Sequence, residues 1–389
     1  MSSQSLRRAL CLTYGAGSIG AGLFSTVPGL LLLFYLTDTL GVAAGLAGVA
    51  VLVPKLWDIA TDPIVGAWSD RTRSRWGRRR PFLLAGALTL PPCFVALFSA
   101  PVGDPRVAFV WVLVAFCLAA GAFTLFQVPY ATMPAEMTAD YHERTTLVAY
   151  RMAFVTVGIL AGGALAPALI EAGGGGPAGY TFMAVVLSLV TAAAMLVAFF
   201  GTRDAPQFEA AEATPSLRAQ IRIALEDRGF RNLWLAFGLQ CVGTGAVLAD
   251  VPYFVRYTLS EGQGATTALF LCLVGPAAVA MPLWTAVSRR LGKKRGYIAA
   301  TVAFAALAAS LLFAGPGRLP LVCAQVGLLG VGFAGLQVFP FAMLPELIDE
   351  DARRTGIRRE GVFTGLWFVA EKGGFALGAA LVSGLLGAT

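Results

Sequence analysis

Long runs of apolar residues recur along the whole chain, separated by short polar segments. Each run is about twenty residues or longer, the length a helix needs to cross a hydrocarbon core of about 30 Å. The pattern predicts eleven membrane-spanning helices, at 10–36, 41–68, 81–100, 107–133, 146–171, 178–200, 229–257, 263–287, 297–314, 319–345 and 361–386. The predicted fold class is therefore an all-α integral membrane protein.

The longest polar segment, 201–228, separates six predicted spans from five. Near the end of the fourth span Pro129 and Pro134 lie five residues apart, and Pro340 and Pro345 repeat this spacing near the end of the tenth. Each pair is followed by an acidic segment, and the recurrence indicates two parallel repeats of six helices. We expect an N-terminal bundle, a cytoplasmic middle loop and a C-terminal bundle, at 1–200, 201–228 and 229–389.

Six spans followed by five leave the second repeat one helix short. An odd number of spans predicts that the two termini lie on opposite sides of the membrane. A twelfth helix that is naturally absent and a chain that stops early are both compatible with this pattern.

Composition supports the membrane interpretation and excludes several classes of protein. The chain is 57% hydrophobic and 13% charged, with a mean hydropathy of +0.73, whereas soluble domains are about 45–50% apolar and about 25% charged. The six cysteines form no CxxC pair, and His142 is the only histidine. Neither a histidine-based metal site nor a Ser-His-Asp triad can be built from these residues.

The formal net charge of +7 reflects topology. Of the 29 Lys and Arg residues, 23 lie on the side of the predicted spans that holds the N-terminus. The positive-inside rule places that side in the cytoplasm, so we expect a multi-pass protein of the cell inner membrane with a cytoplasmic N-terminus. The basic run at 71–80 lies between two spans, so it favours a topology signal over a nucleic-acid site. We expect membrane lipids as partners, no nucleic acid and a monomer.

Seven ionisable residues lie inside the predicted spans. Each costs about 2.5–3.5 kcal/mol at a helix centre on insertion scales, which makes such residues functional candidates. They are Lys55, Asp58, Asp62, Arg151, Asp250, Glu371 and Lys372. Asp250 is close in sequence to Arg256 on the outer side, so a local ion pair is an equal alternative there.

Lys55, Asp58 and Asp62 share one helix face, because their spacing is i, i+3 and i+7. Two carboxylates one turn apart repel each other unless a cation or a proton lies between them. Oxygen ligands of this kind suit a hard cation such as Na⁺. The alternative is a permanent structural pair in which Lys55 neutralises the acids, although one lysine compensates only one of them.

Two stretches resemble motifs of known transporters. Residues 66–80 resemble the loop after the second helix of the major facilitator superfamily, G-x-x-x-D-R followed by G-R-R. Residues 57–77, which begin WDIATDP and end TRSRWG, are similar to the glycoside-pentoside-hexuronide:cation symporters, the melibiose permease family. The resemblance extends to 12–15, 128–130, 140–144, Arg151, 356–358 with Glu360, and 372–374. It implies the major facilitator fold.

The resemblance also implies a cation site. In that family the two helix 2 carboxylates bind the coupling Na⁺, Li⁺ or H⁺, and they match Asp58 and Asp62. A helix 4 threonine that assists them matches Thr124, and Thr61 takes the place of an intervening Asn. Beyond this coupling ion no cofactor is expected.

The sugar site implied by the resemblance departs from that of the melibiose permease. Gly22 and Gln127 replace two aspartates, and Ala131 and Gln337 replace two tryptophans. A galactoside held by two carboxylates and stacked on Trp is therefore not expected. The family's helix 5 arginine and helix 11 lysine match Arg151 and Lys372, of which the lysine links the substrate and cation sites. The residues expected to bind substrate are Gln127, Tyr130, Arg151, Gln337 and Lys372.

A further group of charged residues is expected to lock and release the two halves as they move. An Asp among several Arg at helix ends forms a salt bridge that can break. The group comprises Lys55, Asp70, Arg71, Arg75, Glu143, Arg144, Glu346, Asp349 and Arg358.

These observations predict a cation-coupled secondary active symporter of a small organic solute, working by alternating access. A sugar or glycoside is the first substrate class, and an amphiphile such as a lysophospholipid is the alternative. An intramembrane enzyme using Asp58 and Asp62 as an acid dyad is disfavoured, because the loops offer no further catalytic groups. A receptor or scaffold that does not transport would show no stabilisation by cations.

Overall fold

The protein is built almost wholly from helices in a computed structural model, which describes residues 8–138, 141–203, 205, 222, 226–355 and 360–388. Eleven helices within these residues are long and apolar enough to cross a membrane. The predicted all-α membrane class and its eleven spans are confirmed. The chain divides into two compact units, Met1–Glu212 with Ala380–Thr389, and Ala213–Ala379.

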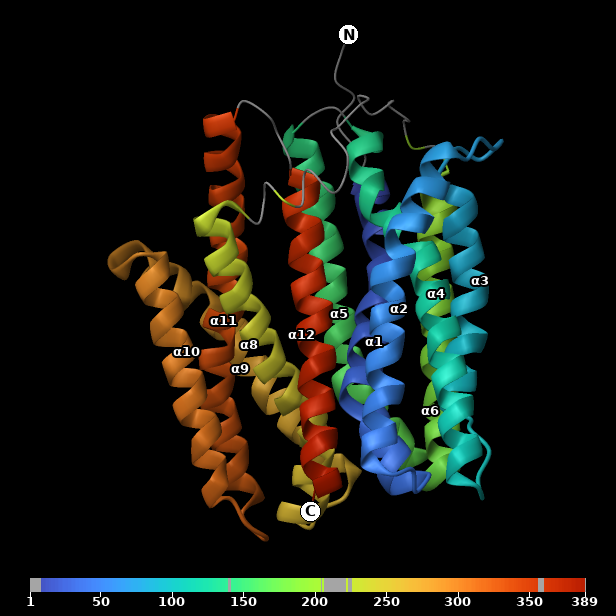
Figure 1. Cartoon of the computed structure of the whole chain (residues 1–389), viewed down its shortest axis with the longest axis vertical. Coiled ribbons are helices and arrows are strands. Elements are labelled where there is room, and N and C mark those ends of the chain that lie inside the picture. Colours follow the sequence, from blue (N-terminus) through green and yellow to red (C-terminus); the bar gives the residue numbers. More distant parts are fainter. Residues whose placement is uncertain are drawn as a thin grey trace. The chain divides into compact units, whose positions relative to one another are not determined.

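The first unit contains six helices among its described residues. They are α1 (Arg8–Phe34), which continues into a π-helical turn (Tyr35–Thr39), α2 (Ala44–Arg71), α3 (Arg80–Leu97), α4 (Pro105–Met137), α5 (Tyr141–Ala172) and α6 (Gly176–Gly201). Within this unit α1 packs on α5 and α6, α3 packs on α4 and α6, and α2 packs on α4 (Figure 1). The contact of α2 with α4 is the one that positions the acidic residues of α2.

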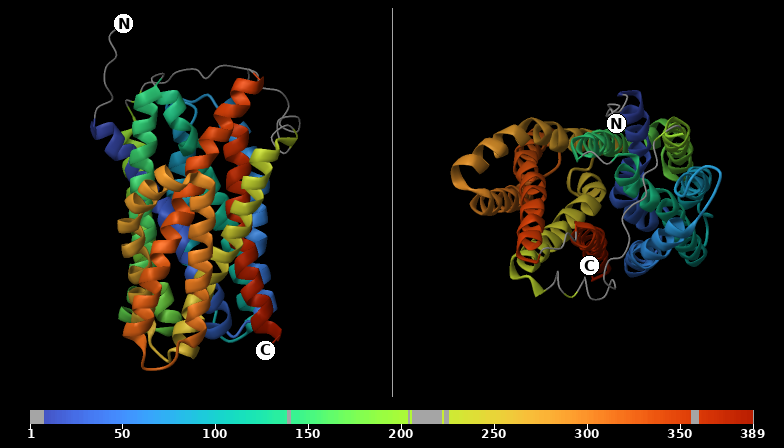
Figure 2. Two further views of the ribbon diagram at one scale, coloured as in Figure 1. Left: turned by 90° about the vertical axis from the view of Figure 1, so that its left-hand side faces the viewer. Right: turned by 90° about the horizontal axis from the view of Figure 1, so that it is seen from above.

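The second unit begins with α8 (Arg228–Tyr253), which also continues into a π-helical turn (Phe254–Thr258). It continues with α9 (Gln263–Leu291), α10 (Lys293–Ser310) with a short 3₁₀ turn (Leu311–Phe313), α11 (Leu319–Thr355), and α12 (Glu360–Ala388) as far as residue 379. Figure 2 shows α9, α10 and α11 side by side, and α11 packs on both of the others. Buried aromatic residues of α8 and α12 form the core between these two helices, with Trp367 stacked on Phe237 at a ring distance of 4.0 Å.

Glycines bring the first helix of each unit against another helix. In the first unit a Cβ on Gly22 of α1 would overlap the backbone of α5, and a Cβ on Gly158 of α5 would overlap the backbone of α1. In the second unit Gly245 of α8 and Gly378 of α12 meet in the same way. Small residues allow helix backbones to approach this closely in a membrane. Both crossings therefore depend on backbone contact rather than on interlocking side chains.

A buried carboxylate joins three helices at one end of the first unit. The Nε of Arg79, at the start of α3, donates to Oε1 of Glu136 near the end of α4 at 2.8 Å. Arg78 lies 3.1 Å from the same oxygen, and Nη1 of Arg79 donates to the Ser69 hydroxyl on α2 at 2.5 Å. The side chains of Glu136 and Arg79 are only 11% and 9% exposed. Glu136 thereby fixes the ends of α2, α3 and α4 together.

The second unit has a related contact. Lys293 at the start of α10 pairs with Glu346 on α11 and donates to the carbonyl of Ala342 at 2.9 Å. Glu136 follows Pro134 by two residues, and Glu346 follows Pro345 directly. The recurring proline spacing is therefore accompanied in each unit by an acid that holds the start of a neighbouring helix.

The glycine crossings generate a prediction about stability. Gly158→Ala and Gly378→Ala should lower the unfolding temperature in detergent, because each added Cβ collides with backbone and overpacking costs about 1–3 kcal/mol. Gly243→Ala on α8 is the matched control, because its Cβ would meet nothing within 4 Å. That control should be neutral or stabilising, since Ala favours a helix over Gly by about 1 kcal/mol. Equal effects of all three substitutions would contradict the assigned crossings.

The Glu136 contact generates a second prediction. Glu136→Gln should destabilise the protein by about 3 kcal/mol, because it removes the carboxylate that lies 2.7 Å from the buried Arg79 guanidinium. The same change at Glu226 is the control, since its pair with Arg222 is exposed (side chains 60% and 81%) and such pairs contribute about 0–1 kcal/mol. Thermal unfolding followed by tryptophan fluorescence measures both. A shift no larger for Glu136→Gln than for Glu226→Gln would contradict the assignment.

Candidate functional site

The two carboxylates of α2 meet a single hydroxyl of α4. Thr124 Oγ1 donates to Asp62 Oδ1 at 2.9 Å and lies 3.4 Å from Asp58 Oδ1. Asp58 and Thr124 are each only 1% exposed, and Asp62 is half-buried. One proton donor thus lies between two acidic groups, inside a helix pair that spans the apolar region.

Lys55 occupies the same face of α2, toward its start. Its Nζ lies 5.6 Å from the centroid of the Phe116 ring on α4. The helices α2 and α4 run side by side in the same direction. The contact of Lys55 with Phe116 therefore lies about two turns nearer the start of both helices than the contact of Asp62 with Thr124. This contact is a cation–π interaction.

Thr61 directs its hydroxyl back into its own helix. Its Oγ1 donates to the carbonyl of Trp57 at 3.0 Å and lies 3.4 Å from the carbonyl of Asp58. The oxygen keeps acceptor capacity, but the bond anchors it along α2. Of the two threonines that the sequence singled out, Thr124 is the one whose hydroxyl donates to the carboxylates.

The oxygen atoms at this point suit a hard monovalent cation. Two carboxylates and a hydroxyl supply oxygen donors only, which is the preference of hard cations. In the part of the chain that the structure describes, no group of three or more His, Cys, Asp or Glu could hold a metal ion. Because its donors are all oxygen atoms, the set of Asp58, Asp62 and Thr124 differs from a transition-metal site that draws on nitrogen or sulfur ligands.

The same face of α4 continues from the carboxylates to an arginine. Gln127 and Tyr130 follow Thr124 at intervals of three residues, and such residues are neighbours on a helix. The Arg151 guanidinium carbon, on α5, lies 5.6 Å from the Tyr130 ring centroid. Gln127 Oε1 and Arg151 Nε are both buried and have no hydrogen-bond partner among the described residues. Arg151 lies over the Tyr130 ring, and Gln127 precedes Tyr130 by three residues on α4.

Tyr130 is held in place by α1. It is fully buried, and its ring stacks on that of Tyr14 with centroids 4.6 Å apart. The Tyr14 hydroxyl donates to the Tyr130 carbonyl at 3.0 Å, while the Tyr130 hydroxyl bonds the Tyr14 carbonyl and the Ser18 hydroxyl. The Tyr130 hydroxyl is already hydrogen-bonded to α1, so Arg151 contacts the face of the Tyr130 ring.

The structure explains why position 22 is a glycine. In the resemblance to the melibiose permease, Gly22 only stands where a substrate-binding aspartate is expected. In the structure Gly22 faces the backbone of α5 at Val155, Gly158 and Ile159, and a side chain has no room there. The close approach of α1 and α5 therefore takes the space in which an acid would stand.

The predicted substrate residues of the second unit lie on α11 and α12. Gln337 is half-buried on α11, and Lys372 is half-buried on α12 beside Glu371. The sequence did not reveal Gln240 on α8, whose Oε1 accepts from the Tyr297 hydroxyl at 2.6 Å and whose Nε2 donates to the Leu336 carbonyl at 3.2 Å. Gln240 and Tyr297 lie on different helices, so no spacing of neighbouring residues in the sequence could predict their contact.

The expected gating residues are found in different environments. Glu346 pairs with Lys293, and Glu143 accepts from the Thr138 hydroxyl at 2.7 Å. Arg71, Arg75 and Asp349 are exposed, and Arg75 lies over the ring of Trp76. Arg358 and the side chains of Asp70 and Arg144 lie outside the described residues. Glu136, which lies two residues after the second proline of its pair, is the acid that sequence reasoning missed.

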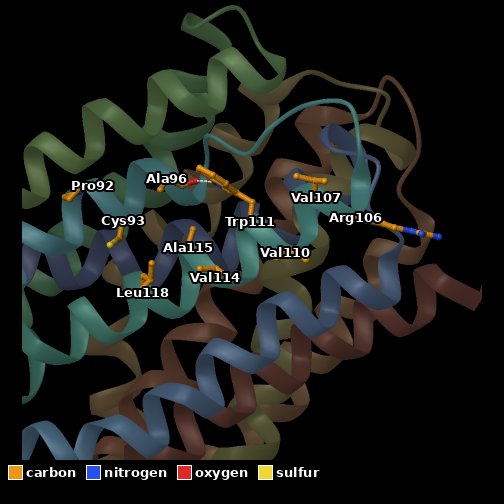
Figure 3. A pocket seen from close by; sticks show the side chains of 10 residues that line it. All are labelled: Pro92, Cys93, Ala96, Arg106, Val107, Val110, Trp111, Val114, Ala115 and Leu118. Carbon is orange, nitrogen blue, oxygen red and sulfur yellow. Dashed lines mark hydrogen bonds between the residues drawn. The ribbon is translucent and has the colours of Figure 1, made fainter.

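An apolar groove of about 770 Å³ lies between α3 and α4, apart from these polar groups (Figure 3). Val114 and Leu118 on its α4 side are 52% and 60% exposed. Trp111 closes part of it by donating its indole N–H to the Ala96 carbonyl at 2.8 Å. Its lining is almost entirely apolar, with Arg106 at one end, so it differs in chemistry from the carboxylate site.

Comparisons with known proteins agree with this architecture. A putative glycoside/cation symporter of Escherichia coli is 29% identical, covering 96% of this chain and 81% of its own. A sodium-dependent lysophosphatidylcholine symporter of Danio rerio is 24% identical, covering 89% and 72%. The crystal structure of a bacterial homolog to the human lysosomal transporter Spinster has the same fold, with a TM-score of 0.70 at 15% identity over 96% of this chain and 80% of that one.

The family comparison covers nearly the whole chain. A family model described as MFS/sugar transport protein matches residues 13–389. The resemblance to glycoside:cation symporters and the major facilitator fold are confirmed by these matches, as is the interpretation of a transporter rather than an enzyme. The chain belongs to the MFS/sugar transport protein family.

Proposed function

We propose that the protein is a secondary active symporter that carries a monovalent cation and a small organic solute across the membrane together. The observation that carries this proposal is the Thr124 hydroxyl between the carboxylates of Asp58 and Asp62. Two carboxylates one turn apart in an apolar region repel each other, so a cation that enters between them gains the attraction of both. Coupling follows if the solute binds better once this charge is compensated.

Na⁺ is the first candidate for the coupling ion, with Li⁺ and H⁺ as alternatives. Asp58, Asp62 and Thr124 would supply its oxygen ligands, with Thr61 close along α2. Protonation of one carboxylate would remove the same repulsion, which is why H⁺ fits the same residues.

A sugar or glycoside is the first solute class, in agreement with the relative named as a glycoside/cation symporter. An amphiphile such as a lysophospholipid is the second, because another relative is named as a lysophosphatidylcholine symporter. The residues proposed to bind the solute are Gln127, Tyr130, Arg151, Gln337 and Lys372.

The proposed mechanism is alternating access between the bundles 1–200 and 229–389, joined by the loop 201–228. The concentration of basic residues on one side supports a cytoplasmic N-terminus in the cell inner membrane. Lys55 within α2 would form and break contacts during the exchange. So would the charged residues expected near the helix ends, namely Asp70, Arg71, Arg75, Glu143, Arg144, Glu346, Asp349 and Arg358. The protein would act as a monomer among membrane lipids, without nucleic acid.

The cation site can be tested by uptake into proteoliposomes under an imposed gradient of Na⁺, Li⁺ or H⁺. Asp58→Asn and Asp62→Asn should abolish the stimulation of solute uptake by the cation, because each removes a charge that attracts it. Thr124→Val should raise the cation concentration needed for half-maximal stimulation about tenfold, the effect of losing about 1.4 kcal/mol of binding.

Matched controls lie elsewhere in the first unit. Thr89→Val on α3 removes an exposed hydroxyl bonded within its own helix, and Asp38→Asn removes an exposed carboxylate in the π-helical turn after α1. Both should retain cation-stimulated uptake. Full cation dependence in Asp58→Asn and Asp62→Asn would show that the site lies elsewhere.

A further inference from the structure

We infer that Cys272 of α9 and Cys323 of α11 form a site of covalent modification, at which their two thiols are oxidised to a disulfide that links the helices near the outer face of the membrane. A hydrogen bond joins the two thiols in the structure, where both cysteines are free and half-buried. The inference goes beyond the proposed symport, because neither the cation nor the solute uses this site.

The backbones of α9 and α11 approach each other closely at this level. A Cβ on Gly330 of α11 would overlap the carbonyl of Leu273, and a Cβ on Gly327 would lie 3.7 Å from the carbonyl oxygen of Cys272. Cys323 precedes Gly327 by one turn of α11. A disulfide requires such an approach, because its two Cα atoms lie about 4.4–6.8 Å apart. The glycines therefore bring cysteines of two separate helices within bonding range.

Both cysteines border one apolar cluster of the second unit. The buried members of this cluster include Leu269 of α9 and Val322 and Val326 of α11, and Cys272 and Cys323 pack against it. Figure 2 shows the two helices side by side. Packed helices hold the thiols next to each other, while partial exposure leaves their sulfur atoms open to a reagent.

The pair lies toward the outer end of the second unit on the proposed topology. Both α9 and α11 then run inward from the outer face, where each helix begins. Cys323 follows the exposed Arg318 by only five residues, a rise of about 7.5 Å along a helix. Disulfides form and persist in the oxidising compartments outside the cytoplasm, whereas cytoplasmic thiols are kept reduced.

The oxidation is a thiol–disulfide exchange with a disulfide-bearing oxidant of that compartment. The thiolate of one cysteine attacks the oxidant, forms a mixed disulfide and releases one of its sulfurs as a thiol. The thiolate of the other cysteine attacks the cysteine sulfur of the mixed disulfide, which forms the new S–S bond and releases the second thiol. The two cysteine protons end on the two released thiols, and the oxidant gains the two electrons that the cysteine sulfurs lose.

A disulfide fits this pair better than a metal ion. A structural zinc site takes four ligands, and thiolates are commonly joined there by further cysteines or histidines. Among the residues that the structure describes, no group of three or more His, Cys, Asp or Glu could hold a metal ion. Two thiols in mutual contact therefore have oxidation to a disulfide as their simplest joint chemistry.

Peptide mapping of the full chain tests the cross-link. Membranes are treated with N-ethylmaleimide before solubilisation, which blocks free thiols, and the purified chain is digested with trypsin. The peptide 257–289 contains Cys272 as its only cysteine, and the peptide 319–353 contains only Cys323. The two peptides should be joined without reductant and separate after dithiothreitol. Cys272→Ser and Cys323→Ser should each abolish the joined species.

Thermal unfolding supplies a second measurement. Dithiothreitol should lower the unfolding temperature of the wild-type chain by about 5 °C or more, because a disulfide that closes a long loop restricts the unfolded chain. Cys272→Ser and Cys323→Ser should unfold near the temperature of the reduced wild type and should not respond to the reductant. Cys117→Ser changes a half-buried cysteine of α4 and is the matched control. It should keep both the joined peptides and the response.

Separate, maleimide-labelled peptides from folded protein overturn the inference. Peptides that become joined only after oxidised glutathione is added to the purified chain also overturn it, because the thiols are then reduced in the membrane. A joined species that contains a different cysteine contradicts the pairing. Both measurements are independent of transport, so failure of cation-stimulated uptake would leave the cross-link standing. Absence of the cross-link in a chain with cation-stimulated uptake would leave the symporter standing.

Discussion

The Thr124 hydroxyl carries one proton and faces two carboxylates, those of Asp58 and Asp62. Two acidic groups this close in an apolar region repel each other, so the energy of the contact between α2 and α4 depends on how their charges are compensated. A cation that is bound and released at this point would change how the two acids are compensated. Lys55 lies on the same face of α2 as the two acids, and Gln127 lies one turn beyond Thr124 on α4.

The first unit neutralises its buried charges in two different ways. Glu136 is compensated permanently by Arg78 and Arg79, which come from the same unit and keep the ends of three helices together. Arg151 has an aromatic support but no fixed anion among the described residues. The permanent ion pairs of Glu136 hold helix ends together. Arg151, which has no such ion pair among the described residues, lies where a solute could supply the opposite charge.

Local pattern was enough to predict the helices and the face of α2 that carries Asp58 and Asp62, because span length and i, i+3, i+7 spacing are properties of neighbouring residues. Thr124 emerged only through family resemblance, since its partners lie more than sixty residues away. Glu136 with Arg79 and Gln240 with Tyr297 were missed for the same reason, each pair being 57 residues apart. From the sequence, Gly22 was interpreted only as the loss of a carboxylate. The structure shows that its missing side chain lets the backbone of α5 pack against α1.

The glycine crossings of α1 with α5 and of α8 with α12 have a consequence for how such a protein can diversify. Because these contacts are made by backbone, they constrain a few positions strongly and place few demands on the side chains around them. Drift at the remaining positions can then alter which solute is accepted without loosening the scaffold. Lineages that keep these glycines are free to exchange one cargo for another by a small number of substitutions on the inward faces of the same helices.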